Sequence, residues 1–82
     1  MELTIRVGRE GVLMTRQAAE IAEAMKAYES RVLLRHENIT VNAKSLMGLV
    51  SLGIRGGMPV TILSEGNDDA KAACAMAKLL GS

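Results

Sequence analysis

The sequence lacks most of the residue types on which nucleic-acid, metal and disulfide sites are built. It contains no Trp, no Phe and one Tyr, so it offers no aromatic platform for stacking bases. Ten Lys and Arg residues against nine Asp and Glu residues leave a net charge of +1, without the basic excess that neutralises phosphates. One Cys and one His cannot build an internal disulfide or a structural metal cluster. We therefore expect no direct contact with nucleic acid, no metal and no cofactor.

Long hydrophobic runs are also missing. No apolar run approaches the ~20 residues of a membrane-spanning helix, and residues 1–4 (MELT) do not begin a signal-peptide pattern. A lone Cys74 without a secretory signal is typical of a reducing compartment. These absences predict a cytoplasmic protein that does not associate with a membrane.

The chain does contain a large aliphatic fraction. Hydrophobic residues make up 49% of it, and they are almost entirely Leu, Ile, Val, Met and Ala. With 82 residues and a mass of 8.7 kDa, the chain has room for one domain, residues 1–82, around one modest core.

The spacing of the apolar residues predicts seven elements in the order β-α-β-β-α-β-α. Alternation of apolar and polar side chains indicates strands, and apolar stripes at helical spacing indicate helices. The expected elements are, in chain order, a strand over 3–7, a helix over 16–27, strands over 31–36 and 39–44, a helix over 46–52, a strand over 58–63 and a helix that follows residue 67.

Polar residues at the ends of these elements predict caps and turns. Thr15 and Asn67 are the expected N-caps of the first and last helices. Glu37 and Asn38 are expected to form a tight turn, with Asn38 in the left-handed conformation. The last helix is expected to bury a narrow stripe of mostly small residues, formed by Ala70, Ala73, Cys74, Ala77 and Leu80.

One-sided strands need one face covered, and three amphipathic helices can cover it. The economical arrangement is an α+β fold, in which a four-stranded antiparallel sheet carries the three helices on one face.

The short helix over 46–52 is the unusual element, because apolar side chains surround most of its circumference. A helix on the surface of so small a domain cannot bury all sides, so one or two of these side chains should be exposed and mark a partner site. Met47 is the best candidate, since its flexible thioether adapts to different partners. The alternative is that the domain packs this helix deeply and none of them binds a partner.

Ser45 precedes this helix, where its ordinary role is that of an N-cap. The same position suits phosphorylation, because free amides and the positive end of the helix dipole stabilise a phosphoryl group. A phosphate on Ser45 would place charge beside an apolar surface without unfolding the helix.

Residues 42–54 (NAKSLMGLVSLGI) resemble the regulatory-serine segment of HPr, the histidine-containing phosphocarrier of the bacterial phosphotransferase system. The element order and the spacings along nearly the whole chain are also similar to that family. The resemblance implies the HPr fold, an open-faced β-sandwich, and identifies Ser45 as the regulatory serine.

The sequence departs from this family at the carrier site. HPr proteins have a Gly-[hydrophobic]-His-Ala-Arg-Pro-Ala signature, and residues 12–18 (VLMTRQA) stand in its place. Met14 occupies the position of the carrier histidine, and a thioether has no ring nitrogen to form a phosphoramidate. The resemblance implies that Arg16, with Thr15 beside it, binds an anion at this helix end; the alternative is a solvated arginine in a first helical turn.

No other residue is a convincing substitute for the missing histidine. His36 is expected at the surface at a strand end, a phosphoester on Thr15 would be too stable for rapid transfer, and Cys74 is expected in the core. No nucleophile–base pair, carboxylate dyad or phosphate-cradling loop can be assembled, so no enzyme is expected.

The first functional hypothesis is a regulatory binding module, similar to the catabolite-repression HPr-like proteins that lack the carrier histidine. That resemblance implies phosphorylation of Ser45 by HPr kinase/phosphorylase and binding to a LacI-type catabolite control protein. Arg16 and the phosphoserine would make the polar contacts. The apolar contacts would come from Leu46, Met47 and Val50.

Two other hypotheses remain open. The chain could be a phosphocarrier of the phosphoenolpyruvate-dependent sugar phosphotransferase system with an atypical acceptor. It could instead be an unmodified interaction domain in which the apolar surface alone acts, through homodimerisation for example.

Overall fold

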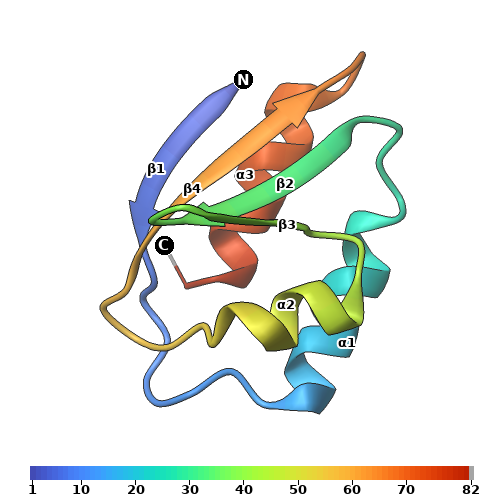
Figure 1. The fold of residues 1–82 in the computed structure, drawn as a ribbon. Coiled ribbons are helices and arrows are strands. Elements are labelled where there is room, and N and C mark those ends of the chain that lie inside the picture. Colours follow the sequence, from blue (N-terminus) through green and yellow to red (C-terminus); the bar gives the residue numbers. More distant parts are fainter. Residues whose placement is uncertain (82) are drawn as a thin grey trace.

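The strands form one antiparallel sheet, and the helices cover one of its faces (Figure 1). The structure, a computed structural model, describes residues 1–81. Its elements are, in chain order, β1 (Glu2–Arg6), α1 (Thr15–Met25), β2 (Arg31–His36), β3 (Ile39–Asn42), α2 (Leu46–Leu52), β4 (Pro59–Glu65) and α3 (Asp69–Leu79). The strands lie in the order β1-β4-β2-β3, and every neighbouring pair is antiparallel. The α+β class and the element order expected from the sequence are confirmed.

Alternation along the two central strands divides the sheet into a buried face and an open one. On the face toward the helices, β2 and β4 bury Val32, Leu34, Val60, Ile62 and Ser64, whereas His36 at the end of β2 is only partly buried. Leu33 and Leu63 lie opposite each other on the other face, where no helix packs, and both are only partly covered. Because successive side chains point to opposite faces, the sheet has one face covered by helices and one face open to solvent, the arrangement called an open-faced sandwich.

The three helices contribute the second layer of the core. α3 packs across β4, β2 and β1, α2 contacts β3, and α1 packs against the other two helices (Figure 1). Each helix inserts fully buried aliphatic or thioether side chains, among them Ile21, Met25, Leu49 and Met76. The core is aliphatic, as the composition predicts.

Several element ends differ from the expected ones by one or two residues, and two of these differences have clear local reasons. α1 begins at Thr15, so Met14 is its N-cap and the expected cap at Thr15 is wrong. β3 ends at Asn42, earlier than expected, because the Asn42 side chain accepts a hydrogen bond from the amide of Lys44 (2.9 Å) and turns the chain toward α2.

The β2–β3 hairpin has its left-handed residue at the first loop position. Glu37, not Asn38, has a positive φ of 55°. His36 and Ile39 pair directly and leave a two-residue loop. Loops of this length match the twist of the strands when the first loop residue has a positive φ. The expected turn is therefore present, but the residue assigned to the left-handed conformation was wrong.

The buried stripe of α3 is rotated from the expected one. Ala70 and Cys74 are exposed, so the expectation of a core Cys74 is wrong. The buried residues of the helix are Ala72, Ala73, Met76 and Ala77. Met76 is the large apolar side chain on this helix face, and burying it removes more apolar area from water than burying Cys74 would. Asp68 is the N-cap in place of the expected Asn67.

Candidate functional site

Ser45 lies at the amino end of α2 and caps it. Its Oγ accepts a hydrogen bond from the amide of Gly48 (3.1 Å), and its carbonyl accepts one from the amide of Leu49 (3.1 Å). The side chain is half-buried, and the first turn of α2 contains no acidic residue. The expected N-cap is confirmed. The hydroxyl therefore stands at the positive end of the helix with no fixed carboxylate in that turn to oppose added negative charge.

Two glycines determine where α2 ends and how closely it packs on β3. A Cβ on Gly48 would lie 3.2 Å from both the Asn42 carbonyl oxygen and the Val41 Cβ, so a larger residue there would push the helix or β3 aside by a few tenths of an ångström. Gly53 ends the helix in the left-handed conformation with a φ of 66°. The short helix is thus held on the edge strand at one end and terminated at the other.

α2 divides its apolar side chains between the core and the surface. Leu49 and Leu52 are 1% and 7% exposed, and Leu46 is half-buried. Met47 and Val50 are 72% and 40% exposed, and their i, i+3 spacing places them on one side of the helix. The expected exposure of Met47 is confirmed, whereas its role in partner binding stays a prediction.

The start of α1 is built differently. Met14 is its N-cap, makes no side-chain cap hydrogen bond and is 68% exposed. The amide of Met14 donates to Oε1 of Gln17 (2.9 Å), so the glutamine that replaces the family's proline reaches back over the first turn. Thr15 and Arg16 are exposed. Their anion-binding role stays a prediction.

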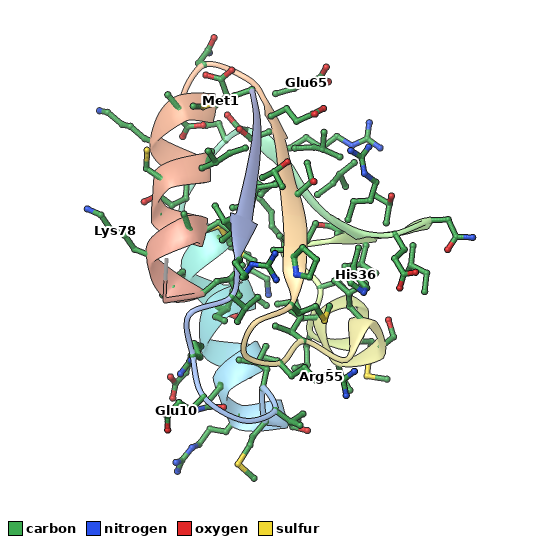
Figure 2. The ribbon with its side chains drawn as sticks, turned by 90° about the vertical axis from the view of Figure 1, so that its left-hand side faces the viewer. Met1, Glu10, His36, Arg55, Glu65 and Lys78 are labelled. Carbon is green, nitrogen blue, oxygen red and sulfur yellow. The ribbon has the colours of Figure 1, made fainter. Side chains whose placement is uncertain are left out.

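Backbone hydrogen bonds bring the start of α1 beside the end of α2. The Leu13 amide donates to the Ile54 carbonyl (2.8 Å), and the Gly56 amide donates to the Gly11 carbonyl (3.0 Å). Figure 2 shows this part of the molecule, with Glu10 and Arg55 labelled, at the end opposite Met1 and Glu65. Four large apolar side chains are exposed on α2 and on the segment that leads into α1, and α1 and α2 pack against each other. We call Val12, Met14, Met47 and Val50 the apolar surface.

Val12 is the residue of this surface that sequence reasoning missed. Its side chain is 64% exposed, and its backbone pairs with Arg55 in an isolated bridge. The available signal was an apolar residue directly after Gly11, outside any periodic segment.

The remaining candidate acceptors lie elsewhere and are unsuited to transfer. His36 is 21% exposed, less than expected; its Nδ1 lies 2.7 Å from the Pro59 carbonyl and its Nε2 lies 3.1 Å from the Glu37 carboxylate. Both ring nitrogens are therefore engaged. Cys74 is exposed, but it lies on α3. Neither residue stands beside Met14 or Ser45.

A hollow on the surface also lies away from Ser45 and Met14. It has a volume of about 370 Å³ and opens on the uncovered sheet face, over Leu33 and Leu63. Its rim includes Met1 and Glu65, which Figure 2 shows at the far end from Arg55. The candidate site is accordingly an exposed surface around two helix starts and not a pocket.

Asp68, before α3, is the described carboxylate whose pKa is clearly shifted. A hydrogen bond from the Ser30 hydroxyl lowers the pKa most, and the amide of Glu29 (3.0 Å) lowers it further. The side chain thereby ties the α1–β2 connection to the start of α3. This shift belongs to a structural tether and not to the candidate site.

No arrangement in residues 1–81 points to a metal or a membrane span. His, Cys, Asp and Glu side chains do not gather in groups of three that could hold a metal ion within that range. Over the same residues, no helix has the length and apolarity needed to cross a membrane.

Residues 1–82 match the family model described as the phosphotransferase-system HPr component phosphorylation site. The chain belongs to the HPr family. The HPr-like protein Crh of Halalkalibacterium halodurans is 35% identical over 72 residues, which cover 88% of this chain and 86% of that protein. The resemblance noted in the sequence, including the likeness to catabolite-repression HPr-like proteins, is confirmed.

Solved HPr and Crh structures share the fold. The phosphocarrier protein HPr from Bacillus anthracis superposes with a TM-score of 0.90 at 32% identity, covering 96% of this chain and 94% of that one. Crh of Bacillus subtilis, whose crystal structure is a dimer with swapped domains, gives a TM-score of 0.80 at 32% identity, covering 94% and 88% of the two chains. The open-faced sandwich of the family is therefore the fold of this protein.

Proposed function

We propose that this protein is a cytoplasmic, HPr-like regulatory protein without phosphocarrier activity. In this proposal it is a binding module that is switched by phosphorylation of Ser45 in carbon catabolite regulation. It catalyses no reaction itself. The observation that carries the proposal is the Met14 side chain, which stands at the first turn of α1 where the family signature has its histidine.

The chemistry of Met14 supports the loss of phosphoryl relay. A relay needs a nucleophile that binds phosphorus in a labile bond and then releases it. The thioether has no proton to exchange and no ring nitrogen. The neighbouring Thr15 hydroxyl would form a stable phosphoester. Relay by this end of α1 therefore lacks an acceptor.

The surroundings of Ser45 support the switch. Phosphorylation would add up to two negative charges at a helix start whose dipole favours them, while α2 carries no carboxylate in that turn. Met47 lies in the same turn and is largely exposed. The phosphate would therefore change the charge beside the apolar surface while the buried side of α2 stays in place.

The partners follow from the family resemblance. HPr kinase/phosphorylase would transfer the phosphoryl group from ATP or pyrophosphate, and a LacI-type catabolite control protein would bind the phosphorylated form. Arg16 would contact an acidic or anionic group of the partner, with Thr15 beside it. The apolar contacts would come from Leu46, Met47 and Val50.

Incubation with an HPr kinase/phosphorylase and ATP, followed by intact-mass measurement, tests the proposal. We expect one acid-stable phosphoryl group, absent from Ser45→Ala. Ser51→Ala is the matched control, because Ser51 is an exposed serine of the same helix whose hydroxyl donates to the Gly48 carbonyl (2.8 Å). No addition to the unmodified sequence, or equal addition to Ser45→Ala, would remove the switch.

The alternative function is that of a phosphocarrier with an atypical acceptor. The close superposition on the Bacillus anthracis phosphocarrier favours it. That likeness concerns the fold, and a fold alone does not determine the chemistry of a site. Phosphoryl transfer from phosphoenolpyruvate separates this function from the proposed one.

A further alternative is an unmodified interaction domain that pairs with a second copy of itself. The swapped dimer of Bacillus subtilis Crh favours pairing. Sedimentation across a concentration series measures it directly: a rise in weight-average mass with concentration supports a homodimer, and a constant monomer mass excludes it.

A further inference from the structure

The methionines of this protein fall into two groups by exposure. Three are in the core, with 0% exposure at Met25 and Met76 and 9% at Met58. Met14 and Met47 are 68% and 72% exposed, which makes them the most exposed thioethers of residues 1–81. Met1 is 48% exposed and lines the hollow on the sheet face, at the opposite end of the molecule (Figure 2).

The two most exposed thioethers belong to the same surface. Met47 stands in the first turn of α2 and Val50 follows it on the same side of the helix. Met14 is the N-cap of α1, which packs against α2. The two exposed thioethers thus stand at the starts of two neighbouring helices, and the core methionines are shielded.

We propose that Met14 and Met47 form a reversible oxidation site that lowers the affinity of the apolar surface for its partners. In the reaction a sulfur lone pair attacks one oxygen of hydrogen peroxide, and the O–O bond breaks. The sulfur becomes a sulfoxide, having lost two electrons. The other peroxide oxygen leaves as water after taking up a proton. Methionine sulfoxide reductases, which use thiols as reductant, restore the thioether.

The physical consequence is a change from apolar to polar at two side chains of the apolar surface. A thioether is flexible and weakly polar, whereas a sulfoxide oxygen is a strong hydrogen-bond acceptor that resists desolvation. Because the change is at exposed side chains, the buried face of α2 stays packed. The effect on binding rests on the proposed function. The selectivity of oxidation does not.

Peptide mass mapping after graded hydrogen peroxide treatment tests the selectivity. The Cys74→Ser variant is used throughout, because the exposed thiol on α3 would consume oxidant. We expect sulfoxide at Met14 and Met47 to form at least about tenfold faster than at Met25 and Met76, in line with exposure. Equal rates at the four methionines would overturn the proposal.

The rate of Ser45 phosphorylation by HPr kinase/phosphorylase tests the consequence. We expect oxidation to lower this rate about tenfold, which is the effect of losing one well-buried apolar contact. The control is Met14→Leu/Met47→Leu in the same background, which keeps the surface apolar and removes both thioethers. Peroxide treatment should leave the phosphorylation rate of this variant equal to its own rate before treatment.

The outcomes separate the two proposals. An untreated protein that is not phosphorylated contradicts the proposed function, and with it the regulatory effect, while the mapping still decides whether the two thioethers are a selective oxidation site. An untreated protein that is phosphorylated at the same rate after oxidation overturns the regulatory effect alone. If oxidation lowers the phosphorylation rate of the double leucine variant equally, the effect comes from another residue. This outcome also overturns the regulatory effect of Met14 and Met47.

Discussion

The starts of α2 and α1 share the same helical geometry but carry different chemistry. At α2, Ser45 provides a side-chain oxygen that caps the Gly48 amide and can also accept a phosphoryl group. At α1, Met14 provides a thioether that makes no cap hydrogen bond and cannot relay phosphorus. Met14 belongs to the apolar surface, and Ser45 precedes the helical turn that carries Met47.

This difference shows which part of an HPr fold can change without loss of the fold. The carrier position is exposed and lies outside the core, so its replacement by Met14 costs little packing. Ser45 is half-buried and satisfies an amide of a helix that packs on β3, so its replacement affects both structure and signalling. The following predictions test this contrast, from the largest expected effect to the smallest.

Met14→His should produce the largest change, a gain of phosphoryl acceptance from nothing detectable. The variant puts an imidazole at the exposed N-cap of α1, where a ring nitrogen can form a phosphoramidate. The measurement is intact mass after incubation with phosphoenolpyruvate and the general phosphotransferase enzyme. Thr15→His is the matched control, one residue away and also exposed. If Met14→His accepts no phosphoryl group, Thr15 and Gln17 also block the site.

Leu49→Ala and Met47→Ala should separate the two sides of α2. Leu49 is 1% exposed, so we expect Leu49→Ala to lower the free energy of unfolding by about 2–5 kcal/mol. Met47 is 72% exposed, so Met47→Ala should stay within about 0.5 kcal/mol. Urea unfolding measures both. A large loss in Met47→Ala would mean that this side chain supports the fold.

Cap substitutions at the two helix starts should change stability in opposite directions. Ser45→Ala removes the acceptor for the Gly48 amide and should destabilise the protein by about 1 kcal/mol, whereas Met14→Ser adds a cap and should stabilise it by a similar amount. Ser45→Asp should be neutral or stabilising by about 0.3–1 kcal/mol at low salt. Urea midpoints give the signs, and a strongly destabilised Ser45→Asp would contradict the phosphorylation-compatible helix start.

Asp68, at the third helix start, should give the smallest effect and one that depends on pH. Its folded-state pKa lies below its ordinary value of 3.8, mainly because of the Ser30 hydroxyl. The tether therefore contributes stability above the unfolded-state pKa, and that contribution is lost as pH falls through the lower folded-state pKa. Asp68→Asn should make thermal stability less dependent on pH below about 4, and an unchanged dependence would remove this role.

The sequence predicted the fold well because most elements carry a clear period or clear signals at their ends. β2 alternates over six residues, and α2 is bounded by Ser45 and Gly53, so both were placed correctly. The stripe of α3 was misplaced because Ala and Cys are so small that hydrophobic periodicity barely distinguishes one helix face from the next. The burial of Met76 determines which face of α3 packs on the sheet, and this burial cannot be predicted without the tertiary structure.

The candidate site was only partly predictable. The cap at Ser45 and the exposure of Met47 follow from local sequence, because caps and surplus apolar residues leave local signals. The place of Met14 follows instead from the resemblance to the HPr signature. Val12 does not, because its place beside Arg55 depends on a long-range backbone pairing. The partial burial of His36, outside the candidate site, was also missed, because its contact with the Pro59 carbonyl joins strands that are separate in sequence.

The most direct test of the central claim is the intact mass of the unaltered protein after exposure to phosphoenolpyruvate and the general phosphotransferase enzyme. A histidine-bearing HPr in the same tube confirms that the enzyme is active. If Met14 has ended phosphoryl relay, the mass of this protein stays unchanged while that of the HPr rises. An acid-labile phosphoryl group on this protein, passed on to a sugar-specific phosphotransferase component, would contradict the account.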